Sequence, residues 1–277
     1  MRRANGLLGV ALQTAALTAA GLLVAFLALP PLALVLRIPV GSVLSRFAEP
    51  VVLEALRLSL LTSLAATALV MLLGLPLAYA LVSRSLRGRR LIETLIDLPM
   101  VLPPTVAGAG LLFAFGRAGL LGGALGALGI SIPFTTVAVV LAQTFVAAPF
   151  FVSTVVAGLR EVEPRYLELA ATLRASPSTT FVRVMLPLSL PSILAGAGMA
   201  WARALGEFGA TITFAGNLPG VTRTLPLAVY TALQSDLEAA VSLSVVLLVV
   251  SFVVLLGLRG SGIGALPRRV RAPRRAR

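Results

Sequence analysis

Residues 161–191 read EVEPRYLELAATLRASPSTTFVRVMLPLSLP and carry three carboxylates and three arginines between two strongly apolar blocks. This charged segment is nevertheless patterned for helix. Pro164 suits a first helical position, and apolar residues follow it at offsets of three and four. Ser176 before Pro177 indicates the N-cap and first turn of a second short helix, which Leu186-Pro187 would close or kink. We therefore expect two short helices joined by a turn, standing outside a membrane.

The first of these helices is predicted to be amphipathic. One face would carry Tyr166, Leu169, Ala170 and Leu173. A short helix with an exposed apolar face fits a groove on a partner protein. A solvated loop that happens to be helical is the alternative, and periodicity alone does not decide between them.

The composition indicates an integral membrane protein. Hydrophobic residues make up 58% of the 277 and charged residues 12%, and the mean hydropathy is +1.01. The chain has no Lys, His or Cys, so all 23 positive charges are Arg. Without these residues there is no P-loop lysine, no Schiff base, no imidazole base, no thiolate and no ordinary zinc or iron site. We expect no catalytic residue, cofactor or metal site of its own.

Six apolar runs predict six membrane spans, since about 20 apolar residues cross a bilayer. The first follows a basic start, so a cleaved signal peptide competes with a retained span, but the run is too long for a signal core. The third contains Pro99, Pro103 and Pro104 and should face other helices or a water-lined path. Ser235 and Glu238 are spaced as a capping box before the last span. The runs are Ala4–Leu36, Leu58–Ser83, Leu98–Gly116, Phe134–Gly158, Leu188–Arg203 and beyond, and Ala239–Leu258.

The arginines predict the orientation of these spans. Seventeen of them lie in the N-terminal segment, the loop after the second span, the segment after the fourth span and the C-terminal tail. Six lie on the other side, in loops that include an external segment at Arg37–Arg57 and a glycine-rich turn after Arg117. By the positive-inside rule both termini and residues 161–191 are cytoplasmic. The basic tail, 259–277, is expected to anchor the topology and contact anionic lipid rather than nucleic acid.

A second informative stretch reads WARALGEFGATITFAGNLPGVTRTLPLAVY, residues 201–230. Arg203 and Glu207 are four apart on what should be one helix, so they are expected to pair. Charged residues inside a membrane usually pair and face the bundle interior or an aqueous cavity. The pair either locks the fifth helix in place or helps to line or gate a conduction path, together with the hydroxyls of Thr211 and Thr213. Asn217 to Gly220 is a turn signal before a short external helix or re-entrant segment.

Residues 161–191 resemble the Glu-Ala-Ala loop of the membrane subunits of ATP-binding-cassette (ABC) importers. The matching positions are Tyr166, Glu168, Ala170, Thr172, Leu173, Ala175, Ser176, Val184, Leu186 and Pro187. Leu169 stands where the family has Ala. Arg174 stands where it has Gly, and since Arg adopts positive φ at a cost, the turn is expected to be built differently.

The second stretch is similar to permease subunits for tetrahedral oxyanions, above all to the molybdate branch. The similarity lies in RALGEFGAT at 203–211, AGNLPG at 215–220 and TRTLP at 222–226. Sulfate and thiosulfate permeases share these elements in looser form, and the sequence does not separate molybdate from tungstate. The resemblance makes 52–258 the permease domain, with 1–51 an N-terminal helix and external loop.

The resemblance implies a fold and a set of partners. It implies the all-α, six-helix fold of type I importers, with cytoplasmic coupling helices between spans four and five. Two copies of the chain would pair, two ABC ATPase subunits would bind the coupling helices and hold ATP and Mg²⁺, and an extracytoplasmic protein would deliver the oxyanion. The implied docking residues are Tyr166, Glu168, Leu169, Ala170, Leu173, Arg174, Ala175, Ser176 and Pro177.

Two other classes of function remain open. A secondary transporter or channel would need no ATPase, and should show an internal repeat or a broken-helix pair in corresponding halves. No convincing repeat is present. An intramembrane enzyme would need a nucleophile with a base, and serine with neither His nor Lys supplies no such pair.

Overall fold

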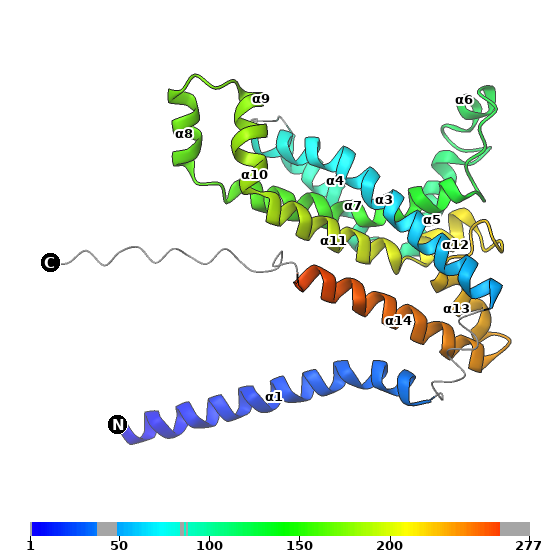
Figure 1. The fold of residues 1–277 in the computed structure, drawn as a ribbon, viewed down its shortest axis with the longest axis horizontal. Coiled ribbons are helices and arrows are strands. Elements are labelled where there is room, and N and C mark those ends of the chain that lie inside the picture. The colour runs from blue at the N-terminus through cyan, green and yellow to red at the C-terminus, as the bar shows by residue number, and fades with distance from the viewer. Residues whose placement is uncertain (1, 38–48, 84–85, 87, 261–277) are drawn as a thin grey trace.

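The structure is a computed structural model that describes residues 2–37, 49–83, 86 and 88–260 (Figure 1). Most of the predicted external loop, part of the basic loop near residue 85 and the basic tail lie outside the described residues. The elements in chain order are α1 (Arg2–Arg37), α3 (Pro50–Ser83), α4 (Arg89–Val101), α5 (Pro104–Phe115), α6 (Gly122–Ala127), α7 (Thr136–Arg160), α8 (Pro164–Thr172), α9 (Pro177–Thr180), the π-helix η1 (Phe181–Met185), α10 (Leu186–Leu188), α11 (Leu190–Leu205), α12 (Gly209–Ala215), α13 (Leu225–Leu233) and α14 (Leu237–Gly260).

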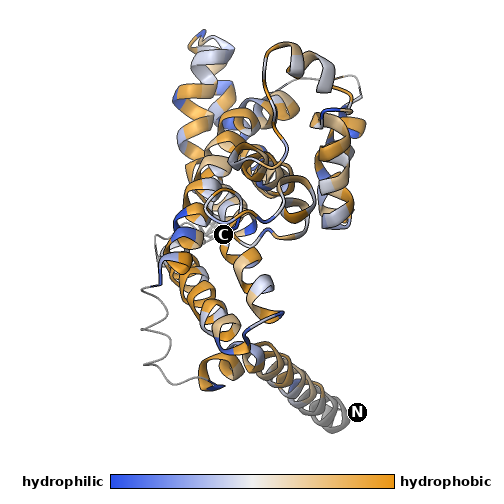
Figure 2. Cartoon of the chain, turned by 90° about the vertical axis from the view of Figure 1, so that its right-hand side faces the viewer, coloured by the Kyte–Doolittle hydropathy of each residue, from blue (hydrophilic) through white to orange (hydrophobic). Residues whose placement is uncertain are grey.

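The described part of the chain is helical and contains no strand, which confirms the predicted all-α class. Four helices, α1, α3, α7 and α14, are long and apolar enough to cross a membrane. Two further pairs, bent at a short break, bring the possible crossings to six among the described residues. The hydropathy colouring shows apolar residues predominating along the long helices (Figure 2).

The third span is not the single helix that its apolar run predicts. It consists of α4 and α5, whose axes differ by 118°. Leu102 and Pro103 each precede a proline, and both are extended, with ψ of 133°. A residue before proline is pushed out of the helical region by the proline ring. Two prolines in succession therefore break the helix completely, where one would kink it.

The core is a bundle in which α7 packs between α3 and α11. Small residues line α3 where α7 crosses it. A Cβ on Gly74 would lie 2.8 Å from Cδ1 of Phe151, so the absent side chain makes room for the aromatic ring of α7. Ala66 and Ala78 are fully buried in the same cluster. Close approach of helices through small residues is the usual way in which membrane helices gain packing energy.

The elements outside the bundle gather at its two ends. The hairpin of α8 and α9 projects from one end, and the start of α1 and the end of α14 lie towards that same end (Figure 1). At the other end lie α6 and α13 (Figure 1). The two stretches that carry the family resemblance thus occupy different levels of the molecule, joined by α11.

The start of α14 differs by one residue from its predicted cap. The carboxylate of Asp236, not the hydroxyl of Ser235, accepts a hydrogen bond from the backbone N–H of Ala239 at 3.0 Å. Ser235 instead donates to the carbonyl of Thr231 at 3.4 Å, at the end of α13. Asp is as good a cap as Ser, and it lies three residues before the amide that needs a partner.

Candidate functional site: an exposed helical hairpin and a buried ion pair

α8 exposes an apolar stripe at the tip of the hairpin. Leu169 is 59% exposed and Leu173 is 81% exposed, whereas Ala170 is buried and Tyr166 is half-buried. The four residues keep the helical spacing that predicts one face, but that face is only partly exposed. Because α8 packs sideways against η1, Ala170 turns inward and the two leucines, one helical turn apart, face outward.

The turn after α8 keeps the conformation that glycine would favour. Arg174 has φ of 55°, in the left-handed region. Its N–H donates to the carbonyl of Ala171 at 2.9 Å, and the N–H of Ala175 donates to the carbonyl of Ala170 at 3.0 Å. These two bonds form a Schellman motif, which satisfies the last carbonyls of the helix. The expectation of a differently built turn is wrong, because the two hydrogen bonds hold Arg174 in the costly conformation.

The second helix of the hairpin begins as its sequence predicts. Ser176 caps it by accepting from the N–H of Thr179 at 3.2 Å, and Pro177 occupies the first turn. The helix does not close at Leu186-Pro187. It continues through the π-helix η1 and through α10, and the axis then bends by 70° at Ser189 before α11. Single π-helical turns are rare in proteins, and those that occur are often found at functional sites.

Tyr79 joins the hairpin to the end of α3. Its ring lies 4.1 Å from the ring of Phe181, centroid to centroid, and its hydroxyl donates to the carbonyl of Pro177 at 3.4 Å. Glu168, by contrast, lies exposed on the outer side of α8. The hairpin therefore presents a free outer face and has a root fixed to the bundle, which is the arrangement that a docking lever needs.

The ion pair of Arg203 and Glu207 forms, although not on one helix. Nη1 of Arg203 lies 2.7 Å from Oε2 of Glu207, whose side chain is 1% exposed. α11 ends at Leu205, so the pair bridges a break before α12. Oε1 of Glu207 accepts from the N–H of Ala210 at 2.8 Å, and thus binds the N-terminal end of α12. The predicted helix is interrupted between Gly206, which follows the last residue of α11, and Phe208, which precedes α12.

Thr211 and Thr213 follow on α12 and differ in their surroundings. Thr213 donates to the carbonyl of Gly209 at 2.9 Å. Thr211 is fully buried, and its hydroxyl has no hydrogen-bond partner within the described ranges.

Close packing explains the glycine at position 209, since a Cβ there would lie 2.7 Å from Cβ of Pro104 in α5. Gly206 has no such neighbour, its nearest being 3.7 Å away.

Gln143 is a further candidate functional residue, which the sequence analysis did not identify. It lies on α7, is fully buried, and neither atom of its amide finds a partner in the part of the chain that the structure describes. Buried amides are normally satisfied by protein or by ordered water. As the one side-chain amide in the apolar run Phe134–Gly158, Gln143 could have been identified from the sequence by that isolation.

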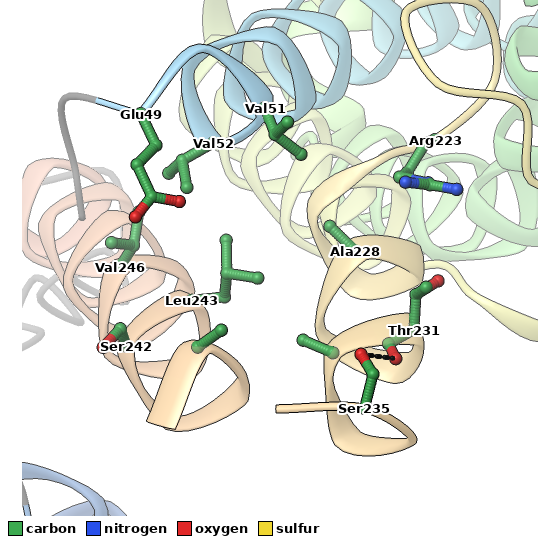
Figure 3. A pocket seen from close by; sticks show the side chains of 12 residues that line it. Glu49, Val51, Val52, Arg223, Ala228, Thr231, Ser235, Ser242, Leu243 and Val246 are labelled. Atoms are coloured by element: carbon green, nitrogen blue, oxygen red, sulfur yellow. Dashed lines mark hydrogen bonds between the residues drawn. The ribbon is translucent and has the colours of Figure 1, made fainter. Parts of the chain in front are cut away.

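A cavity of about 210 Å³ lies at the other end of the molecule, between the start of α3, α13 and α14 (Figure 3). Figure 3 shows Leu243 and Ala228 between polar side chains that stand around the edge. Arg223, on this edge, donates from Nε to Oδ1 of Asn217 at 3.0 Å, so its guanidinium is bound to the turn that precedes α13. Glu49 places a carboxylate in the same wall. Arg223 is the one cation among the described residues that line the cavity, so these residues form no cluster of free cations that would hold an oxyanion.

Comparison with known proteins identifies the family. Residues 70–262 match the family described as binding-protein-dependent transport system inner membrane component. The chain is 49% identical over 237 residues to the molybdenum transport system permease protein ModB of Mycobacterium tuberculosis, covering 85% of this chain and 89% of that one. It is 33% identical over 234 residues to a probable sulfate transport system permease protein, cysT, of Nephroselmis olivacea, covering 80% and 82%.

The fold has a counterpart among solved structures. A bacterial ABC transporter that imports the acidic polysaccharide alginate matches with a TM-score of 0.70, covering 94% of this chain and 96% of that one. At 16% identity this match supports the fold alone. With the family match and the ModB identity, the chain belongs to the inner-membrane permease components of binding-protein-dependent ABC transport systems.

Proposed function

We propose that this chain is the membrane-spanning permease subunit of an ATP-driven importer that carries molybdate across the cytoplasmic membrane. The observation that supports molybdate is the higher identity to a molybdenum permease than to a sulfate permease, over similar lengths of chain. Tungstate has nearly the same size and charge and is the closest alternative cargo. Sulfate and thiosulfate are the next alternatives.

The hairpin of α8 and α9 is the proposed docking site for a cytoplasmic ABC ATPase. Leu169 and Leu173 supply the exposed apolar contact, and Glu168 beside them supplies a charge for orientation. The arginine distribution of the sequence supports a cytoplasmic position for the hairpin and both termini. The end that carries α6 and α13 then faces outward, where an extracytoplasmic binding protein would deliver the oxyanion. Two copies of the chain would enclose the path.

The proposed division of labour leaves nucleotide chemistry to the partner. This chain has no lysine to hold a nucleotide in the P-loop manner, so ATP and Mg²⁺ would belong to the ATPase. ATP binding would draw two ATPases together and pull on α8. The pull would pass through α9, η1 and α10 to α11, whose far end carries Arg203, paired with Glu207 in the break that follows. Rigid-body movement of one element against another is a common form of such switching.

Reconstitution tests the function. The chain would be purified with the ATPase and binding protein of its own organism, placed in liposomes and supplied with radiolabelled molybdate. We expect uptake that requires ATP inside the liposome and is inhibited by tungstate more strongly than by sulfate. Stronger inhibition by sulfate would contradict the cargo. Uptake without any ATPase would favour the secondary transporter or channel.

Orientation has its own test, because the chain contains no cysteine. A Glu168→Cys variant should react with a membrane-impermeant maleimide only when the cytoplasmic face is opened. Reaction in intact cells would place the hairpin outside and refute the docking role.

A further inference from the structure

α4 is attached to the bundle mainly by polar contacts. None of its residues is buried, although Ile92 and Ile96 touch the edge of the core. A cavity of about 250 Å³ is lined by α4, by α7 and by Leu81 of α3, so part of the interface between α4 and α7 is not filled by side chains. Apolar packing is therefore weak here, and the position of α4 depends on the side chains that reach across.

Two bridges reach from α4 to α7. Oε1 of Glu93 accepts from Nη2 of Arg160 at 2.8 Å, and Oδ1 of Asp97 accepts from the hydroxyl of Ser153 at 3.1 Å. Glu93 and Asp97 are one helical turn apart and share a face. Arg160 is the last residue of α7, and α8 begins at Pro164, so the Glu93 bridge ends at the root of the docking hairpin.

α5, which follows α4 in the chain, packs closely against α12. A Cβ on Gly108 in α5 would lie 2.7 Å from the carbonyl oxygen of Ala210 and 2.7 Å from Cβ of Thr213. Gly209 makes a similar contact with Pro104. Only Leu102 and Pro103 separate α4 from α5, and proline fixes its own φ. Displacement of α4 would thus be passed to α5 and to α12, which Glu207 caps.

We propose that Glu93 is a positioning residue for coupling, whose ion pair with Arg160 carries movement of α8 through α4 and α5 to α12. This second route runs beside the covalent one through η1 and α11. It rests on the proposed function, since the movement originates in a docked ATPase. Both routes converge on the break that holds Arg203 and Glu207.

The exposure of the pair sets the size of the effect. The side chains of Arg160 and Glu93 are 48% and 35% exposed, so water weakens their attraction. Pairs of this kind change an equilibrium by about 1.5- to 5-fold. We define the coupling ratio as the number of ATP molecules hydrolysed per oxyanion transported. Glu93→Gln is expected to raise this ratio by about 1.5- to 5-fold. ATPase binding should be unchanged, because the hairpin keeps its outer face.

A matched control is present in the same cluster. Arg89 also donates to Oε1 of Glu93, at 3.0 Å, but both residues lie on α4, so this bond does not connect α4 to another helix. Arg89→Gln should therefore leave the coupling ratio near that of the unmodified complex, whereas Arg160→Gln should match Glu93→Gln. The double variant Glu93→Gln/Arg160→Gln should be no worse than either single variant, because both remove one interaction.

Covalent rescue distinguishes positioning from simple destabilisation. Asp97→Cys with Ser153→Cys would place the first two cysteines of the chain across the second bridge. Oxidation of this pair in the Glu93→Gln background should restore the coupling ratio, and reduction should remove the gain. Loss of transport on oxidation, or an unchanged ratio in Glu93→Gln, would overturn the inference. Absence of ATP-dependent uptake by the unmodified complex would instead refute the proposed function.

Discussion

Leu173→Ala should weaken binding of the ATPase without affecting the fold of the permease. Leu173 is 81% exposed in the free chain, so most of its side chain is available for burial on docking. Replacement by Ala removes three carbons, and about 0.8 kcal/mol per buried carbon predicts a loss of about 2 kcal/mol. That loss corresponds to about a 30-fold higher Kd. Titration of the purified ATPase onto the permease in nanodiscs would measure it.

A leucine at the other end of the molecule provides the control. Leu120 is 91% exposed and lies just before α6, away from the hairpin. Leu120→Ala removes the same carbons from a position that is slightly more exposed than Leu173 and should leave Kd unchanged. The thermal unfolding temperature should be the same for both variants and the unmodified chain. If Leu173→Ala and Leu120→Ala bind alike, the exposed stripe of α8 is not the docking surface.

Three further variants test the geometry of the fold. Arg174→Gly should stabilise the turn after α8 by about 1 kcal/mol, because glycine adopts positive φ without the cost of a Cβ; slower hydrogen exchange at Ala175 would show it, and unchanged exchange would contradict it. Gly108→Ala should cost about 1–3 kcal/mol of stability through its clash with α12, while Gly110→Ala, which has open space around it, should be neutral in the same unfolding measurement. Glu207→Ala should cost about 1.5–3 kcal/mol by removing a charged hydrogen bond to α12, and Glu207→Gln should cost less because it keeps an acceptor for Ala210; equal losses would argue against capping by Oε1.

The start of a helix was predictable from the sequence where one or two adjacent residues determine it. Ser176 and Pro177 begin a helix as expected, because a hydroxyl cap and a first-turn proline act within one turn of chain. The single-helix third span failed because the break arises from two successive prolines, whose combined effect exceeds a kink. α5 also packs closely against α12, a contact between residues distant in the chain that no local pattern contains.

Arg174 and Glu93 illustrate two limits of sequence reasoning. Side-chain sterics predicted that Arg174 would avoid the left-handed region, but two backbone hydrogen bonds outweigh that preference. Glu93 was visible as a charge at the edge of an apolar run. Its partner, Arg160, lies 67 positions away in the chain, and only the packing of α4 along α7 joins them. The docking and path roles of the predicted site residues remain predictions.

The isolation of α1 has a consequence for how the chain enters the bilayer. None of its described side chains is buried, it belongs to none of the three core clusters, and its main neighbour is α14. A helix that is apolar around its whole circumference is stable in lipid by itself. It can therefore insert during synthesis, long before α14 leaves the ribosome, and wait there without misfolding. Membrane insertion would then occur in two stages, first of α1 alone and later of the remaining helices.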